Sequence, residues 1–148
     1  MRVLTTSLSP EEQHLVCIAK EARARAQAPY SNYYVGVAVM ATNWFIYSGT
    51  NVERANYTST PHAAQVAIDS MVAHIGPVGI RAVAIVKASR AENPNATAWF
   101  CGHCRGIIWE NCLGQKEVRI ITVVSETEVE VATIGELYPK KFGRKIWV

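Results

Sequence analysis

The sequence lacks any hydrophobic run near the roughly 20 residues that a membrane-spanning helix needs, although 49% of its residues are hydrophobic. A basic segment followed by a long apolar one, which would indicate a secretory signal, is also missing near its start. The net charge of +3 comes without a basic stripe interleaved with aromatic residues, so we do not expect nucleic acid as a partner. We therefore expect a soluble globular protein of the cytoplasm with no membrane contact.

No internal repeat, low-complexity segment or linker divides the 148 residues. A chain of this length can bury a proper hydrophobic core without help from disulfides. We therefore expect one domain that covers residues 1–148.

Cysteine is scarce, with four residues in the chain. Cys101 and Cys104 form a C-x-x-C pair, which in a chain without a secretory signal favours metal ligation in a reducing compartment over disulfides. Cys17 lies between two apolar residues of a predicted helix, where we expect a small buried side chain.

Patterns of hydrophobic residues and turn signals predict the order of the elements. The capping sequence S-P-E-E and helical spacing predict a first helix from Ser9 to about Ala26. Apolar β-branched and aromatic runs predict strands, and two of them form an antiparallel hairpin. The predicted strands cover residues 34–41, 44–52, 81–87, 118–124 and 128–134, and further helices start at 62, near 101 and near 134. This order predicts an α/β fold, a three-layer α/β/α sandwich with a mixed sheet of about five strands.

His62, Cys101 and Cys104 offer one nitrogen and two sulfur donors. Three protein ligands are typical of a catalytic zinc site, whose fourth tetrahedral position stays open. All three lie at predicted helix N-termini, where the helix dipole lowers the pKa of a thiol, and Arg105 would offset thiolate charge further.

Other interpretations of these residues stay open. The C-x-x-C pair is compatible with a redox function, and His103 between the two cysteines could close a structural site as a fourth ligand. His103 is a poorer ligand than His62, because a residue between two ligands on one helical turn points away from their metal.

Several ordered stretches resemble the cytidine deaminase family: A-P-Y-S-N-Y-Y-V-G-V-A, G-T-N-V-E-R-A-N-Y, P-H-A-A-Q-V-A-I, C-G-H-C-R and L-Y-P-K-K-F-G. The resemblance covers most of the chain and implies a cytidine deaminase-like fold, a bound Zn²⁺ and hydrolytic deamination of a cytosine nucleoside. It implies that His62, Cys101 and Cys104 bind the metal.

The same resemblance implies the residues that hold the substrate. Tyr33 would lie against the pyrimidine, while Asn51 and Glu53 would hold the ribose hydroxyls. The backbone near Ala63 and the residues around Phe100 would face the edge of the base. Single-domain members of the family commonly form tetramers, so a homotetramer is expected, with a homodimer as the simpler alternative.

The chain departs from the family at its catalytic position. The family's H-A-E is H-A-A here, so Ala64 stands where a glutamate takes a proton from the attacking water and passes it to the ring nitrogen. The adjacent Gln65 cannot replace it, because it projects about 100° away on a helix and an amide does not shuttle protons. We expect the chain to bind zinc yet to be nearly inactive.

Two explanations for Ala64 remain open. The alanine was introduced into an active deaminase, which the otherwise intact ligand set favours, or the protein is a natural non-catalytic nucleoside-binding relative. A purely structural zinc module is a third hypothesis. Arg54 and Phe100 also depart from the family, and Arg54 would meet a carboxylate or phosphate near the sugar or form an ion pair between subunits. A modified cytosine nucleoside is therefore a plausible substrate.

Overall fold

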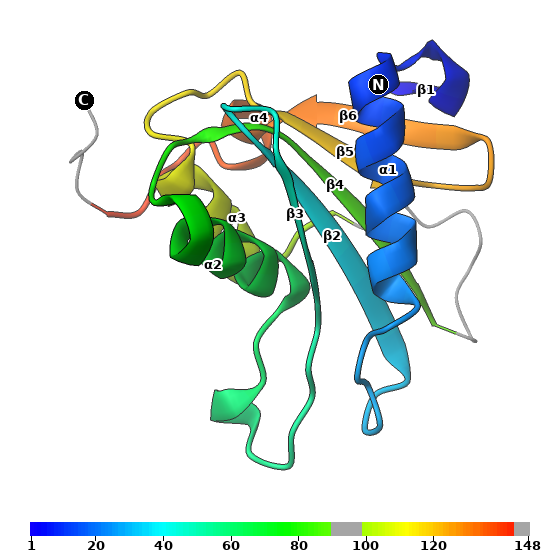
Figure 1. Cartoon of the computed structure of the whole chain (residues 1–148), viewed down its shortest axis with the longest axis vertical. Coiled ribbons are helices and arrows are strands. Elements are labelled where there is room, and N and C mark those ends of the chain that lie inside the picture. The colour runs from blue at the N-terminus through cyan, green and yellow to red at the C-terminus, as the bar shows by residue number, and fades with distance from the viewer. Residues whose placement is uncertain (90–98, 144–148) are drawn as a thin grey trace.

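A computed structural model describes residues 1–89 and 99–143 of the chain (Figure 1). Within them the chain forms six strands, four α-helices and two short 3-10 helices. The strands are β1 (Arg2–Leu4), β2 (Tyr33–Ala41), β3 (Ile46–Thr50), β4 (Ile80–Ser89), β5 (Arg119–Val123) and β6 (Glu128–Thr133). The helices are α1 (Pro10–Arg23), α2 (Ala63–Ile75), α3 (Gly102–Asn111) and α4 (Ile134–Leu137), with 3-10 turns at Thr5–Ser7 and Tyr57–Ser59.

The strands form one mixed sheet in the order β1-β6-β5-β4-β2-β3. The β4–β5 pair is parallel and spans the crossover through α3, while the other pairs are antiparallel. Helix α1 covers one face of the sheet and helices α2 and α3 cover the other, which confirms the three-layer α/β/α prediction (Figure 1). The sheet has one strand more than expected, because the three-residue β1 is too short to carry an alternating pattern.

Strand β2 shows how the sequence divides the interior into two cores. Val37 and Val39 belong to the core beneath α2 and α3, whereas Ala38 and Met40 belong to the core beneath α1. Successive side chains of a strand point to opposite faces of the sheet. The continuous apolar run of β2 therefore indicates a strand that is covered on both sides.

Helix α1 begins as the sequence predicts and ends about one turn earlier. The side chain of Ser9 accepts from the main chain of Glu12, the Glu12 carboxylate accepts from Ser9, and the helix ends at Arg23. The prediction of a buried Cys17 was wrong, because Val16 turns toward the sheet and Cys17 is exposed. In the described part of the chain, none of the helices is long and apolar enough to cross a membrane.

Helix α2 lies directly on the backbone of β3. A Cβ atom on Gly49 would overlap the main-chain nitrogen of Ala67 and would lie 2.5 Å from the carbonyl oxygen of Ala63. Glycine therefore allows a close approach here that a side chain would prevent. Along the chain the contact is close to Asn51, which follows β3, and to His62, which precedes α2.

Candidate active site and metal centre

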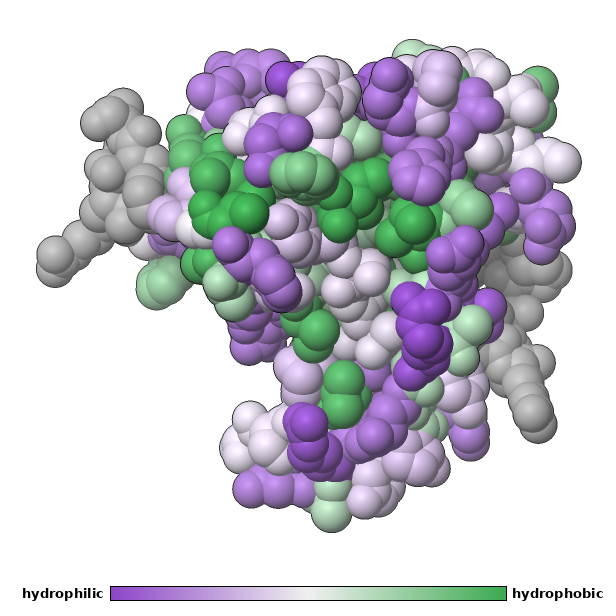
Figure 2. Space-filling view, in the orientation of Figure 1, coloured by the Kyte–Doolittle hydropathy of each residue, from purple (hydrophilic) through white to green (hydrophobic). Residues whose placement is uncertain are grey.

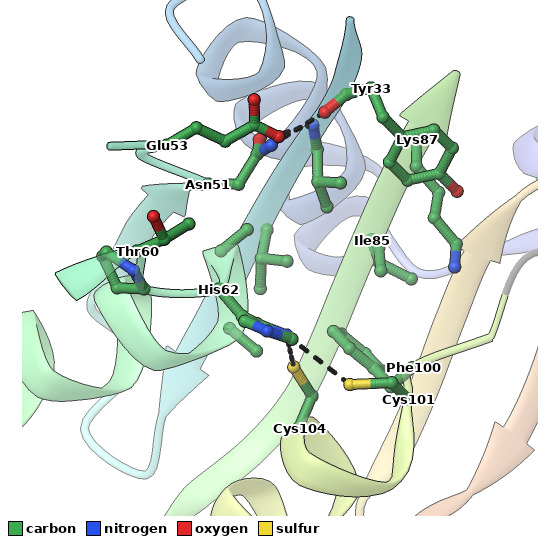
Figure 3. A pocket seen from close by; sticks show the side chains of 15 residues that line it. Tyr33, Asn51, Glu53, Thr60, His62, Ile85, Lys87, Phe100, Cys101 and Cys104 are labelled. Carbon is green, nitrogen blue, oxygen red and sulfur yellow. Dashed lines mark hydrogen bonds between the residues drawn. The ribbon is translucent and has the colours of Figure 1, made fainter. Parts of the chain in front are cut away.

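A pocket of about 270 Å³ opens where the start of β2 and the ends of β3 and β4 meet the loops that lead into α2 and α3 (Figure 3). Apolar side chains of the sheet, among them Val35, Val37 and Ile85, line one wall. Polar side chains of the loops line the remainder. The fold thus gathers chemically active side chains from four separate stretches of the chain.

The three predicted metal ligands converge in this pocket. The imidazole Nδ1 of His62 lies 3.5 Å from Sγ of Cys101 and 3.3 Å from Sγ of Cys104 (Figure 3). The three donor atoms all lie within 4.8 Å of one another. His62 and Cys101 are the N-cap residues of α2 and α3, and Cys104 lies in the first turn of α3.

Burial sets the protonation of two of these donors. Burial, and then the charge of His103, lower the pKa of His62, which favours the neutral imidazole that binds a metal. Burial, and then the charge and hydrogen bond of Cys101, raise the pKa of the Cys104 thiol to about 12, while the charge of Lys87 counteracts the rise. Burial therefore outweighs the decrease in the pKa of the Cys104 thiol that we expected from the helix N-terminus.

The donor set fits a zinc ion. Zinc favours imidazole nitrogen and cysteine sulfur in tetrahedral sites, and a divalent cation deprotonates a coordinating thiol outright. Its binding would therefore release the proton of Cys104, and three protein donors leave one position for a further ligand.

His103 lies beside the donors without joining them. Its ring centroid is 4.8 Å from that of His62, and its Nε2 lies 3.4 Å from Oε1 of Gln65. Among the described residues, the group that could hold a metal consists of His62, Cys101 and Cys104. His103 thus lies outside the candidate ligand group, and its weaker claim as a ligand stays a prediction.

Arg105 supports the loop before α3 and does not pair with sulfur. Its Nε donates to the carbonyl oxygen of Phe100 at 2.7 Å, and a terminal nitrogen donates to that of Leu137 at 2.9 Å. The guanidinium thus ties the segment that carries Phe100 and Cys101 to helix α4. Phe100 itself is buried and lines the pocket.

Asn51 and Glu53 lie in the pocket on the side away from the metal donors (Figure 3). The amide of Asn51 accepts from the main chain of Val35 at 2.9 Å and donates to the carbonyl of Tyr33 at 2.7 Å. One N–H and one lone pair of this amide remain for a ligand. Asn51 therefore joins the end of β3 to β2 and still faces the pocket.

The Glu53 carboxylate accepts three hydrogen bonds from a neighbouring turn. The main-chain nitrogens of Tyr30 and Ser31 each donate at 3.0 Å, and the hydroxyl of Ser31 donates as well. Burial alone would raise the pKa of Glu53, but these hydrogen bonds outweigh it and the pKa is lowered. Glu53 is thus ionised near neutral pH.

Ala63 and Ala64 form the part of the pocket that follows His62. Both are buried, at 3% and 1% exposure, and pack into the core beneath α2. The methyl group of Ala64 faces the pocket at the position where the resemblance implies a carboxylate. Gln65 is absent from the described pocket lining, as expected from its helical position.

Arg54 and Lys87 are two further basic side chains near the pocket. Arg54 is exposed, donates to the carbonyl of Ser59 and is not among the described residues that line the pocket. Lys87, which the sequence analysis missed, does line it. The available signal was its position two residues after Ile85 on a buried strand, which places both side chains on one face.

The three-layer fold and the open cluster of one imidazole and two thiols define a zinc-binding α/β/α domain. A family model described as the cytidine and deoxycytidylate deaminase zinc-binding region matches residues 9–122. A cytidine deaminase of Sporosarcina psychrophila is 32% identical over 133 residues, which cover 90% of this chain and 92% of that protein. The chain belongs to the cytidine and deoxycytidylate deaminase family.

Solved structures agree with this assignment. The crystal structure of cytidine deaminase from Burkholderia pseudomallei is similar with a TM-score of 0.73 and 29% identity, covering 88% of this chain and 98% of that one. The cytidine deaminase from Mycobacterium tuberculosis is similar with a TM-score of 0.71 and 26% identity, covering 90% and 98%.

Proposed function

We propose that the pocket holds a cytosine nucleoside beside a zinc ion bound by His62, Cys101 and Cys104. The reaction served by this arrangement is hydrolytic deamination to the uracil nucleoside and ammonia, which Ala64 slows severely in this chain. The observation that carries the proposal is the convergence of three metal donors in a pocket whose other side presents Asn51 and Glu53.

Different side chains of the pocket would contact the sugar and the base of the nucleoside. Asn51 offers its remaining N–H and lone pair, and Glu53 offers an ionised carboxylate, to the hydroxyls of the sugar. Tyr33 and Phe100 supply aromatic surface against the base. Zinc, when bound, supplies Lewis-acid activation of the attacking water.

Ala64 removes the group that would move protons between water and base. A methyl group neither accepts nor donates a proton, and proton transfer by a positioned side chain contributes roughly 10²–10⁴ in rate, or about 3–5 kcal/mol of barrier. Among the described residues that line the pocket, Glu53 is the one carboxylate, and its hydrogen bonds hold it on the side away from the donors (Figure 3). No described pocket residue replaces the missing acid.

The test is a comparison of the chain as given with its Ala64→Glu variant, both loaded with zinc. Loss of cytosine absorbance and release of ammonia are followed with cytidine, deoxycytidine, cytosine and modified cytosine nucleosides. We expect Ala64→Glu to raise turnover by roughly 10²–10⁴. The preferred substrate then identifies the nucleoside.

Gln65→Glu is the matched control, because it adds the same carboxylate one residue later on a side chain that faces His103. It should leave turnover unchanged. Binding of cytidine without turnover in Ala64→Glu would instead support the alternative function, a natural non-catalytic nucleoside-binding protein. If neither form binds a nucleoside or turns one over, the remaining hypothesis is a structural zinc module.

A homotetramer is the assembly we propose, with a homodimer as the simpler form. Hydrophobic residues reach the surface on the face that carries α2 and the edge strand β3 (Figure 2). Phe45, just before β3, is 65% exposed and Val72 on α2 is 36% exposed. Exposed apolar surface of this kind is typical of contacts between subunits.

A reducing compartment such as the cytoplasm is the location we propose. All four cysteines are free thiols, and Cys101 and Cys104 must remain so in order to bind a metal.

A further inference from the structure

Arg105 holds the two peptide groups on either side of Cys101. Its side-chain Nε donates to the carbonyl oxygen of Phe100 at 2.7 Å, and its main-chain nitrogen donates to the carbonyl oxygen of Cys101 at 2.9 Å. A peptide group is planar, so a carbonyl that is held in place also fixes the plane that reaches the next Cα atom. The two planes meet at the Cα atom of Cys101, and together they set the direction of its Cα–Cβ bond.

The thiol of Cys101 relies on this main-chain conformation. Cys101 is exposed and is the N-cap residue of α3, where its side chain makes no capping hydrogen bond. Cys104, by contrast, is 4% exposed and lies in the first turn of the same helix. The Sγ atom of Cys101 nevertheless points toward His62 (Figure 3). The peptide planes on either side of Cys101 therefore direct its thiol toward the other donors.

Helix α4 provides a fixed point for the other end of the guanidinium. A terminal nitrogen of Arg105 donates at 2.9 Å to the carbonyl oxygen of Leu137, at the end of α4, where carbonyl groups lack partners within the helix. The start of α4 is anchored in turn, because the main-chain nitrogen of Ile134 donates to the carbonyl oxygen of Val118 at 2.9 Å and its side chain is fully buried. A guanidinium is a planar fork, so holding one of its nitrogens orients the other.

We propose that Arg105 is a positioning residue of the metal centre, which holds Cys101 in its ligating orientation and links that orientation to α4. The inference rests on the zinc site of the proposed function and adds to it a residue that contacts neither metal nor substrate. This role differs from the offset of thiolate charge that the sequence suggested, because both side-chain hydrogen bonds of Arg105 go to carbonyl oxygens.

A donor that is already oriented loses less conformational freedom when the metal binds, so Arg105 should raise zinc affinity. The test measures the zinc affinity of the folded chain by competition with a chelator, and it does not depend on turnover. Arg105→Met keeps the apolar stem and removes both side-chain hydrogen bonds, so we expect affinity to fall about 10–100-fold. The absorption spectrum of the Co²⁺-loaded chain should change as well, since it reports the arrangement of thiolates around the metal.

Two further variants separate position from charge. Arg105→Lys keeps the charge but has a single ammonium in place of the fork that reaches two carbonyl groups, so zinc affinity should stay several-fold below that of the unchanged chain. This variant also tests the inference if Arg105→Met does not fold. Arg81→Met is the matched control, because Nε of Arg81 donates to the carbonyl oxygen of Thr42 and Arg81 is not among the described residues that line the pocket. It should leave zinc affinity unchanged.

Urea unfolding of the metal-free chains completes the test. If Arg105→Met lowers their unfolding free energy but leaves zinc affinity and the Co²⁺ spectrum unchanged, Arg105 is a structural residue and the inference is wrong. Full zinc affinity in Arg105→Lys, or an equal loss in Arg81→Met, would contradict it as well. In each of these cases the unchanged chain still binds zinc and the proposed function survives. If the unchanged chain binds no zinc, the proposed function is wrong too.

Discussion

The imidazole Nδ1 of His62 lies 3.3 Å from the Sγ atom of Cys104, although 42 positions separate the two residues. The contact joins the start of α2 to the first turn of α3. Two helices that cover the same face of the sheet therefore begin at one common point, and that point lies in the pocket.

His62→Ala should remove zinc from the purified chain. The substitution deletes one of three donors, and loss of an outer-shell partner alone already costs roughly 10–100-fold in metal affinity. We expect affinity to fall by more than about 100-fold and the melting temperature to fall with it, since a metal bound to the folded state stabilises that state. Metal content by mass spectrometry and a thermal melt measure both effects.

His103→Ala is the control for this experiment, because His103 contacts the ring of His62 from outside the donor group. It should keep one zinc per chain. If zinc is lost in His103→Ala as well, the site is a closed four-ligand structural centre.

Glu53→Gln should destabilise the chain at neutral pH and much less in acid. Folding lowers the pKa of Glu53, so its carboxylate stabilises the folded state above the ordinary pKa of 4.5. This stabilisation disappears as pH falls through the lower pKa of the folded state. Glutamine carries no charge, and its NH2 group cannot accept from the Ser31 hydroxyl as the second carboxylate oxygen does, so we expect a loss of about 2 kcal/mol at pH 7 that shrinks toward acid pH.

Urea unfolding of both proteins over a series of pH values measures this difference. Glu126→Gln, on the exposed turn between β5 and β6, provides the comparison and should leave stability nearly unchanged. If the loss of unfolding free energy in Glu53→Gln stays constant with pH, the packing of the side chain, and not its charge, stabilises the folded state here.

Gly49→Ala should destabilise the chain and weaken metal binding together. The added methyl group would overlap the backbone of α2 at Ala67 and Ala63, so the helix must shift. Overpacking of this kind costs about 1–3 kcal/mol or more. Gly106→Ala is the matched control, because its nearest neighbour would be the hydroxyl of Tyr138 at 3.8 Å and alanine favours a helix. A stable Gly49→Ala variant with unchanged zinc affinity would contradict the prediction.

Local patterns in the sequence predicted most of the fold, because strong local signals agree with the final structure. The capping box of Ser9 and Glu12 marks the start of α1, and the apolar run of β2 marks a strand covered on both faces. The strand β1 depends on pairing with β6, a contact between distant residues that three residues of sequence cannot indicate. The exposure of Cys17 likewise depends on how α1 is rotated against the sheet.

The metal donors were predictable because their chemistry and spacing are distinctive. Lys87 was not, since a lysine at the end of an apolar strand normally reaches solvent, whereas here its Nζ donates to the carbonyl oxygen of Trp99 and its side chain lines the pocket. Arg54 was expected to meet an anion near the sugar or to form an ion pair between subunits; its guanidinium donates to the carbonyl of Ser59, and both roles stay predictions.

The close approach of Gly49 to the carbonyl oxygen of Ala63 fixes how near the end of β3 lies to the start of α2. Gly49 precedes Asn51 by two residues, and Ala63 follows His62 directly, so one backbone contact helps to set the distance between Asn51 and the metal donors. No side chain of Gly49 intervenes between the two backbones at this point. A rigid backbone approach of this kind would keep the separation between Asn51 and the metal donors constant when a ligand enters the pocket.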